Sequence, residues 1–457
     1  MTTTAEVVIC GAGIAGVAAA YHLAVRGGVR DVLLVDERPP LSLTSDKSTE
    51  CYRNWWPGPG DAMVAVMNRS IDLLEDLARE SGNVFRLNRR GYLFATAQPT
   101  VLSGLRRAAE DAASLGAGPL RVHASAPSDY APAPAEGFEA QPTGADLITD
   151  PGLIRRFFPC LAPDTVGVLH ARRCGWFSGQ QLGMHLLERG RAHGVRLLDG
   201  CVERVETAGG RIRGVVVRTR GGSETVWAPR LVIAAGPFLR GVAGLLGIEV
   251  PTFSERHVKI AFSDAIGAIP RDAPMLIWAD PITLPWSEEE RGELSGSDLH
   301  RHLLDELPPG VHGRPEGAEG STTVLALWNY DIRPVEPTFP LEVDPSYPEL
   351  VIRGMARMIP ALGAHLSRLP RCIVDGGYYA KTRENRFLAG PLPVDGAYVI
   401  GALSGYGLMA SNGAADLLAD YICERPLPSY ASAFRLDRYQ DAEYAQLVEQ
   451  WRETGQL

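Results

Sequence analysis

The sequence predicts an α/β protein in which a Rossmann-like domain is interleaved with a second domain built on antiparallel sheet. Three observations support this prediction. A glycine-rich turn at residues 11–16 joins a strand-like run to a helix. The chain has 457 residues, which exceeds what one hydrophobic core usually organises. Alternating, aromatic-containing runs at residues 251–285 and 322–330 favour strands in the second domain.

The first forty residues follow the order strand, glycine turn, helix, strand and carboxylate. Gly11 lets the chain turn sharply off the apolar run 7–10, and Gly13 lets the backbone approach a pyrophosphate without a Cβ in the way. Gly16 lets the following helix pack closely on the sheet. Asp36 falls about 20 residues later, where a carboxylate accepts hydrogen bonds from a ribose. These residues predict a bound dinucleotide.

Composition and charge exclude several other classes of protein. The formal net charge is −9 and no Lys/Arg run is present, which argues against a nucleic-acid or anionic-membrane partner. The first strand begins too early for a signal peptide, so we expect a cytoplasmic protein. The seven cysteines are scattered without a CxxC pair, which predicts neither a disulfide framework nor a zinc site. We expect no metal.

Periodicity places the main elements between these motifs. Helical spacing predicts helices over residues 17–26, 61–80, 101–115 and 412–422. Apolar runs predict strands over residues 89–94, 212–218, 224–228 and 231–236. The uncharged stretch 396–415 is rich in Gly and Ser, which favours a buried loop against a ligand over a transmembrane helix. The charged insertion 286–320 is interpreted either as a lid or as a solvated surface helix with a loop.

Four segments together resemble a known family. They are the N-terminal glycine fingerprint, the strand end Ala234-Ala235-Gly236, the run Gly175-Trp176-Phe177, and the run 397–409, which contains Gly405-Tyr406-Gly407-Leu408-Met409. In this order they resemble the D-amino acid oxidase superfamily of FAD enzymes, and within it monomeric sarcosine oxidase and its relatives. The resemblance implies an FAD-binding domain from residues 1–80, 165–245 and 372–425, a substrate domain from residues 81–164 and 246–371, and a C-terminal extension at residues 426–457.

The resemblance also implies which residues bind FAD. Gly11, Gly13 and Gly16 would lie at the pyrophosphate, and Asp36 at the ribose. The loop at residues 405–408 would present backbone N–H groups to the flavin's pyrimidine edge, where they stabilise negative charge. The full set of expected cofactor residues is Gly11, Ala12, Gly13, Ile14, Ala15, Gly16, Asp36, Glu37, Arg38, Lys47, Ser48, Thr49, Val202, Ala234, Ala235, Gly236, Gly377, Gly405, Tyr406, Gly407, Leu408 and Met409.

Departures from the family are informative. Where sarcosine oxidase tethers its flavin through a cysteine, this chain has Gly377, and residues 44–49 contain no histidine that could serve instead. FAD is therefore expected to be non-covalent. Met409 stands where the family has a lysine that pairs with the substrate carboxylate. Arg53 lies within one residue of the family's other carboxylate-binding position, and a surface ion pair is the alternative interpretation of this arginine.

The candidate catalytic residues are Arg53, His257, Lys259, Tyr379 and Lys381. Strand alternation puts His257 and Lys259 on one face together with Glu255. If that face looks at the flavin, one of them could act as a base or an oxygen-activating cation; otherwise they are solvated polar residues. Tyr379 matches a substrate-site tyrosine of the family, whereas Lys381 has the alternative of capping a turn.

The first function hypothesis is FAD-dependent oxidation of a C–N bond in an amine or N-substituted amino acid, by hydride transfer to flavin N5. The substrate would be a small molecule, and the electrons would pass to oxygen or to an electron carrier. The second hypothesis is a dehydrogenase of a 2-hydroxy acid or alcohol, which the absence of a basic residue in the run 262–269 favours. The third is a non-catalytic flavin-binding module, against which the intact glycine fingerprint argues.

Overall fold

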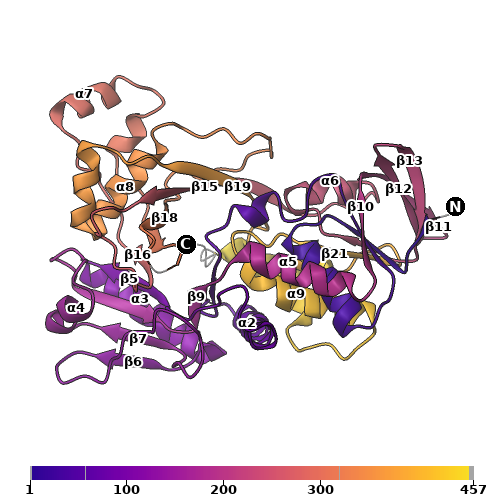
Figure 1. Ribbon diagram of the computed structural model, residues 1–457, viewed down its shortest axis with the longest axis horizontal. Helices are drawn as coiled ribbons and strands as arrows, with labels where there is room; N and C mark the ends of the chain where they lie inside the picture. The colour runs from indigo at the N-terminus through magenta and orange to yellow at the C-terminus, as the bar shows by residue number, and fades with distance from the viewer. Residues whose placement is uncertain (1–2, 57, 319, 452–457) are drawn as a thin grey trace.

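The computed structural model describes residues 3–56, 58–318 and 320–451 and contains two large sheets in two halves of the molecule (Figure 1). A six-stranded sheet organises one half and a nine-stranded sheet organises the other. The chain crosses between the halves several times, because strands of both sheets come from the N-terminal, middle and C-terminal parts of the sequence. The predicted α/β class and the interleaving of two sheets are confirmed.

The six-stranded sheet is Rossmann-like. Its order is β10 (Val195–Asp199), β3 (Val32–Asp36), β2 (Val7–Cys10), β14 (Leu231–Ile233), β21 (Ala397–Gly401) and β20 (Leu388–Pro391). All neighbouring strands are parallel except the last pair, β21 and β20. Parallel strands need cover on both faces. Accordingly Val7 and Ile9 of β2 pack into one core and Val8 and Cys10 into another.

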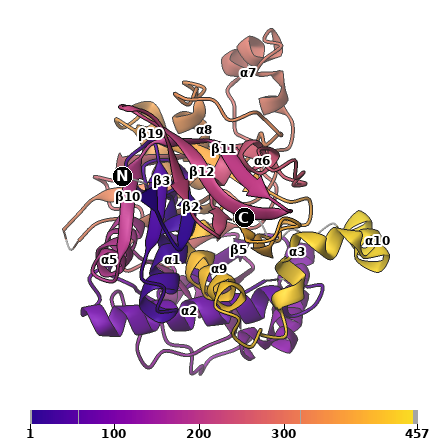
Figure 2. The ribbon, with the colours of Figure 1, turned by 90° about the vertical axis from the view of Figure 1, so that its right-hand side faces the viewer.

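Helices cover one face of this sheet and a second sheet covers the other (Figure 2). The helical layer contains α1 (Ile14–Tyr21), α5 (Gly179–Arg191) and α9 (Gly407–Ile422), with α2 (Ala62–Ser81) against α9. The opposite face carries α6 (Leu239–Gly244) and a four-stranded sheet of β1 (Thr3–Thr4), β13 (Gly222–Trp227), β12 (Arg211–Thr219) and β11 (Cys201–Ala208).

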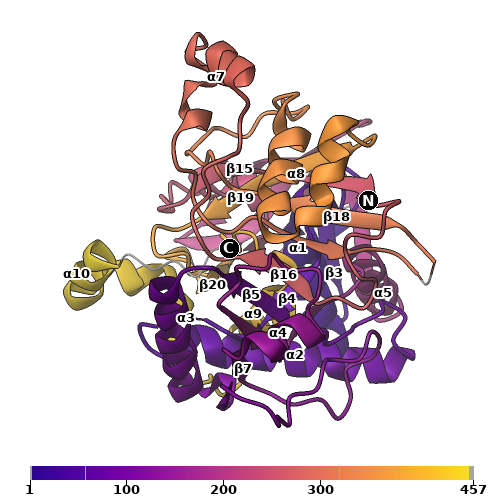
Figure 3. The same ribbon diagram turned by 90° about the vertical axis from the view of Figure 1, so that its left-hand side faces the viewer.

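The nine-stranded sheet is mainly antiparallel, with parallel pairs only at β16–β5 and β6–β7. Its order is β19 (Ile373–Lys381), β15 (Phe253–Ser263), β18 (Thr323–Leu327), β17 (His312–Pro315), β16 (Met275–Trp278), β5 (Tyr92–Thr96), β8 (Gly167–Ala171), β7 (Ala145–Ile148) and β6 (Leu120–His123). Residues of α8 (Tyr347–Met358) and α4 (Pro151–Phe157) join one core, and those of α3 (Pro99–Ala112) join another (Figure 3).

The predicted domain boundaries stay a prediction, but two strands bear on them. Both β8 and β19 fall in the ranges expected for the FAD-binding domain, yet they pair within the nine-stranded sheet. The short strands β4 (Cys51–Arg53) and β9 (Cys174–Trp176) pair with each other in a separate two-stranded sheet. Past α9, the expected extension contains α10 (Ala442–Gln450), which projects from the body in Figures 2 and 3. The last residues of the extension, 452–457, lie outside the described residues.

Several predicted elements differ in their limits. The helix expected at 17–26 is α1 followed by a π-helical turn at His22–Arg26, and the helix expected at 101–115 likewise ends in a π-helical turn at Ala113–Ala117. The stretch 396–415 is not one loop, because it forms β21 and the first half of α9. The insertion 286–320 contains α7 (Glu288–Ser295) and also supplies β17. Among the described residues, no helix combines the length and apolar character that crossing a membrane requires.

Candidate functional site

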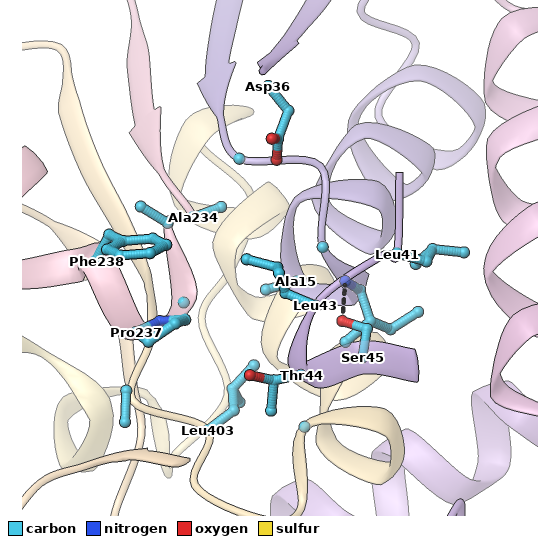
Figure 4. Close-up of a pocket in the computed structure, with 18 of the residues that line it drawn as sticks. Ala15, Asp36, Leu41, Leu43, Thr44, Ser45, Ala234, Pro237, Phe238 and Leu403 are labelled. Carbon is cyan, nitrogen blue, oxygen red and sulfur yellow. Dashed lines mark hydrogen bonds between the residues drawn. The ribbon is translucent and has the colours of Figure 1, made fainter. Parts of the chain in front are cut away.

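A cavity of about 410 Å³ lies at the carboxyl ends of β2, β3, β14 and β21 (Figure 4). The glycine turn after β2, the turn after β14 and the loop before α9 form its walls. This is the place where open α/β sheets bind their ligands, because loops leave adjacent strands there in different directions.

The three fingerprint glycines have two different tasks. Gly11 has φ +110°, and a Cβ there would overlap the carbonyl oxygen of Ala234 at the end of β14. A Cβ at Gly16 would overlap the carbonyl oxygen of Gly11, so both positions need glycine for packing within the protein. At Gly13 the nearest atom to a Cβ would be Ser45 Oγ at 3.4 Å, an ordinary contact. Gly13 therefore leaves space in the cavity itself, which fits a cradle for a phosphate group.

Asp36 joins the glycine turn to the end of β3. Its Oδ2 accepts a hydrogen bond from Ala12 N–H at 2.7 Å, and its Oδ1 accepts one from Arg38 N–H at 3.0 Å. A carboxylate offers about four acceptor positions, so each oxygen retains capacity for a ligand hydroxyl. Asp36 itself lines the cavity, as a ribose-binding acid must.

Most of the residues expected to bind the cofactor do line this cavity. The ones that do not line it are Ala12, Gly16, Lys47, Thr49, Gly377, Tyr406 and Met409. Lys47 forms ion pairs with Asp46 and Asp375 instead, at 2.7 and 3.1 Å. Gly377 packs against Thr44, whose Cα would lie 3.1 Å from a Cβ at this glycine.

Sequence reasoning missed a second group of cavity residues. Ser45 Oγ accepts a hydrogen bond from Ile14 N–H at 3.0 Å, at the start of α1 (Figure 4). Thr44 Oγ1 donates to the carbonyl oxygen of Tyr378 at 3.0 Å and so ties the same turn to β19. Leu41, Leu43, Pro237 and Phe238 also line the cavity. The polar segment after β3 was visible in the sequence, but no periodicity indicated which of its side chains would meet α1.

Four of the candidate catalytic residues lie on one face of the β15–β19 pair. On β15, Val258 and Ile260 point into the core beneath α8, which turns Glu255, His257 and Lys259 toward the other half of the molecule. Tyr379 lies directly opposite Glu255 in the strand register and lines the cavity. This face therefore looks inward, which excludes the alternative of solvated polar residues, while a catalytic role for His257 and Lys259 stays a prediction.

A polar group, here called the Glu255 cluster, consists of the buried residues Glu255, His257 and Lys381 and the half-buried Asn329. Lys381 Nζ donates to Glu255 Oε2 at 2.9 Å, and His257 Nε2 lies 3.2 Å from the same oxygen. His257 Nδ1 lies 3.0 Å from Asn329 Oδ1. The imidazole also stacks on Tyr379, with ring centroids 3.8 Å apart. Lys381 thus pairs with a buried acid and does not cap a turn.

Burial and charge set the protonation of this group. Burial lowers the pKa of His257, and the hydrogen bond to Glu255 only partly opposes it, so the ring is neutral near pH 7. Burial alone would raise the pKa of Glu255, but hydrogen bonds from His257 and Lys381 hold it below its usual range. Burial raises the pKa of Tyr379 to about 12, so its hydroxyl stays protonated. The cluster therefore holds one carboxylate and one ammonium around a neutral imidazole.

Lys259 contacts the backbone of the segment that forms one wall of the cavity. Its Nζ donates to the carbonyl oxygen of Ser48 at 2.7 Å, and Ser48 lines the cavity. Burial lowers the pKa of Lys259, against the opposing effect of Asp375 and Glu50. The neighbouring carbonyl of Thr49 accepts two hydrogen bonds from the buried Arg314, at 3.0 and 2.7 Å. Two cations of the nine-stranded sheet thus fix the segment that forms this wall.

Arg53 lies on the short strand β4, outside the β15–β19 pair that carries most of the Glu255 cluster. It is 5% exposed on β4, with its guanidinium 4.5 Å from the ring centroid of Trp56 and 6.0 Å from that of Tyr92. Burial lowers its pKa, with partial compensation from Tyr92. Arg53 does not line the dinucleotide cavity. Its burial excludes the alternative of a surface ion pair.

Comparisons with known proteins agree with this geometry. The model of the family described as FAD dependent oxidoreductase matches residues 6–421. The chain is 26% identical over 287 residues to mitochondrial dimethylglycine dehydrogenase of Rattus norvegicus, which covers 60% of this chain. The chain spans only 28% of the length of that relative.

Two solved structures share the fold over nearly the whole length of both chains. L-proline dehydrogenase from P. horikoshii has a TM-score of 0.71 at 19% identity. The match covers 96% of this chain and 99% of the proline dehydrogenase chain. Glycine oxidase from Geobacillus kaustophilus also has a TM-score of 0.71, at 16% identity. The match covers 95% of this chain and 99% of the glycine oxidase chain. At these identities the likeness establishes the fold.

Proposed function

The chain belongs to the family of FAD-dependent oxidoreductases, and from this premise we propose that it oxidises a C–N bond in an amine or N-substituted amino acid. The residues present fit FAD. The cavity has a glycine at the phosphate cradle, Gly13, and a carboxylate, Asp36, at the end of β3. Gly377 offers no thiol for a covalent tether, which supports a non-covalent cofactor. Bound FAD would supply a hydride acceptor.

The observation that carries the proposal is the position of Tyr379 between the cofactor cavity and the Glu255 cluster. One side of its ring packs on the glycine loop before α9, where a Cβ at Gly405 would overlap the ring. The His257 imidazole stacks on the ring as well. Tyr379 and His257 thus form a stacked aromatic wall between the Glu255 cluster and the cavity. Such a wall orients a small substrate and excludes water, which hydride transfer requires.

The hydrogen bonds of His257 favour an amine over an alcohol. Hydride removal from an alcohol needs a base for the hydroxyl proton, and histidine is the residue type that most often provides it. Here Nε2–H of the neutral ring donates to Glu255, and Nδ1 accepts from the side-chain amide of Asn329 once the amide oxygen and nitrogen are exchanged, so both ring nitrogens have partners. A neutral amine needs no such base, since its lone pair stabilises the cation that forms. The Glu255 carboxylate would attract that developing positive charge.

The remaining roles are parts of the same proposal. Arg53 would recognise a carboxylate if the substrate is an amino acid, because a guanidinium offers a planar fork of donors. Lys259, a partly desolvated cation against Ser48, is the residue proposed to assist the reaction with oxygen. The alternative acceptor is an electron carrier, as expected for a dehydrogenase. A cytoplasmic location remains a prediction from the sequence.

Anaerobic bleaching of the flavin absorbance tests this proposal. The purified yellow protein is mixed with a panel of secondary amines, amino acids and 2-hydroxy acids, and air is then admitted. Bleaching by amines supports the proposal, and rapid recolouring in air identifies an oxidase. Bleaching by hydroxy acids alone would instead establish the dehydrogenase of a C–O bond. A flavin that no compound bleaches would support the non-catalytic module.

A further inference from the structure

The loop at residues 328–346 leaves the nine-stranded sheet after β18 and passes beside β15 and β19 before it enters α8 (Figure 1). We call it the β18–α8 loop. Val335 N–H donates to the carbonyl oxygen of Ser254 at 2.8 Å, and Pro334 forms an isolated bridge with Glu255. Further along the loop, Tyr378 OH donates to the carbonyl oxygen of Thr338 at 2.8 Å. These contacts fix the position of the residue that follows, Phe339.

Phe339 contacts three residues that line the dinucleotide cavity. The Arg38 guanidinium lies 5.4 Å from the centroid of its ring, and the Phe238 ring lies 6.1 Å from it. The Tyr378 ring meets it edge-on, at 5.3 Å and 83°. The three partners come from the end of β3, the turn after β14 and the strand β19, and all of them line the cavity. Phe339 does not itself line the cavity, but it packs from behind against side chains of three separate walls.

Phe339 adds side-chain contacts to walls that the hydrogen bond from Thr44 to Tyr378 already joins. Arg38 is exposed, and Phe238 is 41% exposed even with Phe339 in contact. A cation held against an aromatic face gains about 0.5–1 kcal/mol at an exposed site, and an aromatic pair gains a similar amount. Arg38 is also a positive charge on the wall of a cavity that fits a ligand with a pyrophosphate. Holding its guanidinium in place therefore favours that ligand electrostatically.

We propose that Phe339 is a cofactor-retaining residue, through which the β18–α8 loop of the nine-stranded half closes the FAD cavity of the other half. A chain that has glycine in place of a tethering cysteine at residue 377 holds its flavin by non-covalent contacts, and Phe339 supports these contacts by slowing FAD release. The inference rests on the family's cofactor and not on the bond that the enzyme oxidises.

The test measures FAD binding in the absence of substrate. Apoprotein is titrated with FAD and the quenching of flavin fluorescence gives Kd, while dilution of the holoprotein gives the release rate. Phe339→Ala is expected to raise Kd about tenfold, which corresponds to about 1.4 kcal/mol, mainly through faster release. Phe339→Leu, which keeps apolar contact but no ring, is expected to lie between Phe339→Ala and the natural protein.

Phe157 provides a matched control. It too is partly buried, with the Arg156 guanidinium 5.1 Å from its ring and the Tyr130 ring edge-on at 4.9 Å. Unlike the partners of Phe339, neither Arg156 nor Tyr130 lines the cavity. Phe157→Ala should leave Kd for FAD within about twofold of the natural value, since no cavity wall changes. Equal weakening by Phe157→Ala and Phe339→Ala would overturn the proposal, as would an unchanged Kd in Phe339→Ala.

A second variant tests the anchoring of the loop. Tyr378→Phe removes the hydroxyl that donates to Thr338 and keeps the ring that lines the cavity. It should speed FAD release, and its effect should be smaller in a Phe339→Ala background because both changes release the same loop. If Phe339→Ala does not fold, Tyr378→Phe alone tests the proposal. An FAD release rate in Tyr378→Phe equal to that of the natural protein would then contradict it. Since no substrate is present, failure of the proposed C–N chemistry leaves this result unaffected.

Discussion

The imidazole of His257 lies parallel to the ring of Tyr379, with 3.8 Å between ring centroids and 15° between the ring planes. The strand register explains this contact. His257 pairs with Gly377, which has no side chain, so the imidazole can lean over the next inward-facing residue of β19, Tyr379. The stack couples the protonation state of the Glu255 cluster to the wall of the cofactor cavity.

This coupling predicts opposite pH effects from two substitutions. Protonated His257 would place a positive charge beside the site where a cation forms, so kcat should fall as pH drops through the pKa of His257. Lys381 lowers that pKa and Glu255 raises it. Lys381→Met should therefore move the acid limb of the kcat profile to higher pH, and Glu255→Gln should move it to lower pH. The measurement is kcat against pH, which reports groups in the enzyme–substrate complex. Shifts in the same direction would contradict the assignment.

The glycine cradle yields a second prediction. Gly13→Ala adds a methyl group that meets only Ser45 Oγ at 3.4 Å, so the apoprotein should unfold within about 0.5 kcal/mol of the natural one. The same methyl group would occupy space needed by a phosphate, so Kd for FAD should rise at least about tenfold. Gly241→Ala, where nothing lies within 4 Å of the added Cβ, is the control: it should leave Kd for FAD unchanged and, because Gly241 lies in α6, raise the unfolding free energy by up to about 1 kcal/mol. Unchanged FAD affinity in Gly13→Ala would place the pyrophosphate elsewhere.

Two substitutions at Tyr379 separate the role of its ring from the role of its hydroxyl. Tyr379→Phe keeps the stack on His257 and should cost less than about 1 kcal/mol in unfolding free energy, whereas Tyr379→Ala leaves a gap and should cost about 3 kcal/mol. In the alanine variant kcat should fall along with stability, because the wall between Gly405 and His257 is lost. Denaturant unfolding and steady-state kinetics on both variants check this. Equal effects of the two substitutions would show that the hydroxyl, and not the ring, matters.

Acid should destabilise the fold through His312. Burial lowers the pKa of this histidine to about 4, and its Nδ1 lies 2.7 Å from the carbonyl oxygen of Gly310. The unfolded chain takes up the proton near pH 6.5, so the stabilisation is present above that pH and is lost as pH falls toward 4. Between pH 7.5 and pH 5 this loss amounts to about 2 kcal/mol.

The measurement for His312 is urea unfolding of the apoprotein at the two pH values. His312→Gln has no proton to gain in this range, so its stability should fall by about 2 kcal/mol less than that of the natural protein between pH 7.5 and pH 5. The comparison within each variant removes any constant cost of the substitution. An identical decrease in both proteins would mean that His312 does not retain its low pKa in the fold.

The dinucleotide half could be predicted because its determinants are local. Gly11, Gly13 and Asp36 act through backbone freedom and through spacing along one βαβ unit, which the sequence displays directly. Alternation also placed Glu255, His257 and Lys259 on one face. It could not say where that face points, because the answer depends on α8, which follows more than eighty residues later and covers the opposite face.

Contacts between residues distant in sequence were the least predictable feature. Ser45 meets Ile14, and Phe339 meets Arg38, because loops of irregular conformation bring together residues that are distant in sequence. No repeating pattern precedes such contacts. The position of Lys381 is similar: its neighbours in sequence suggest a turn, whereas its partner Glu255 comes from another strand. Resemblance to a family identified Tyr379, but the stacking of this ring on His257 required the structure.

The most direct test of the central claim is a single anaerobic turnover with product analysis. The holoprotein is reduced by one equivalent of the best amine substrate, and the released amine or ammonia and the carbonyl product are quantified against the flavin reduced. The proposed C–N oxidation predicts one amine or ammonia and one carbonyl for each flavin reduced, because hydrolysis of the imine cleaves the C–N bond and releases both products. Flavin reduction without release of any nitrogen-containing product would contradict it.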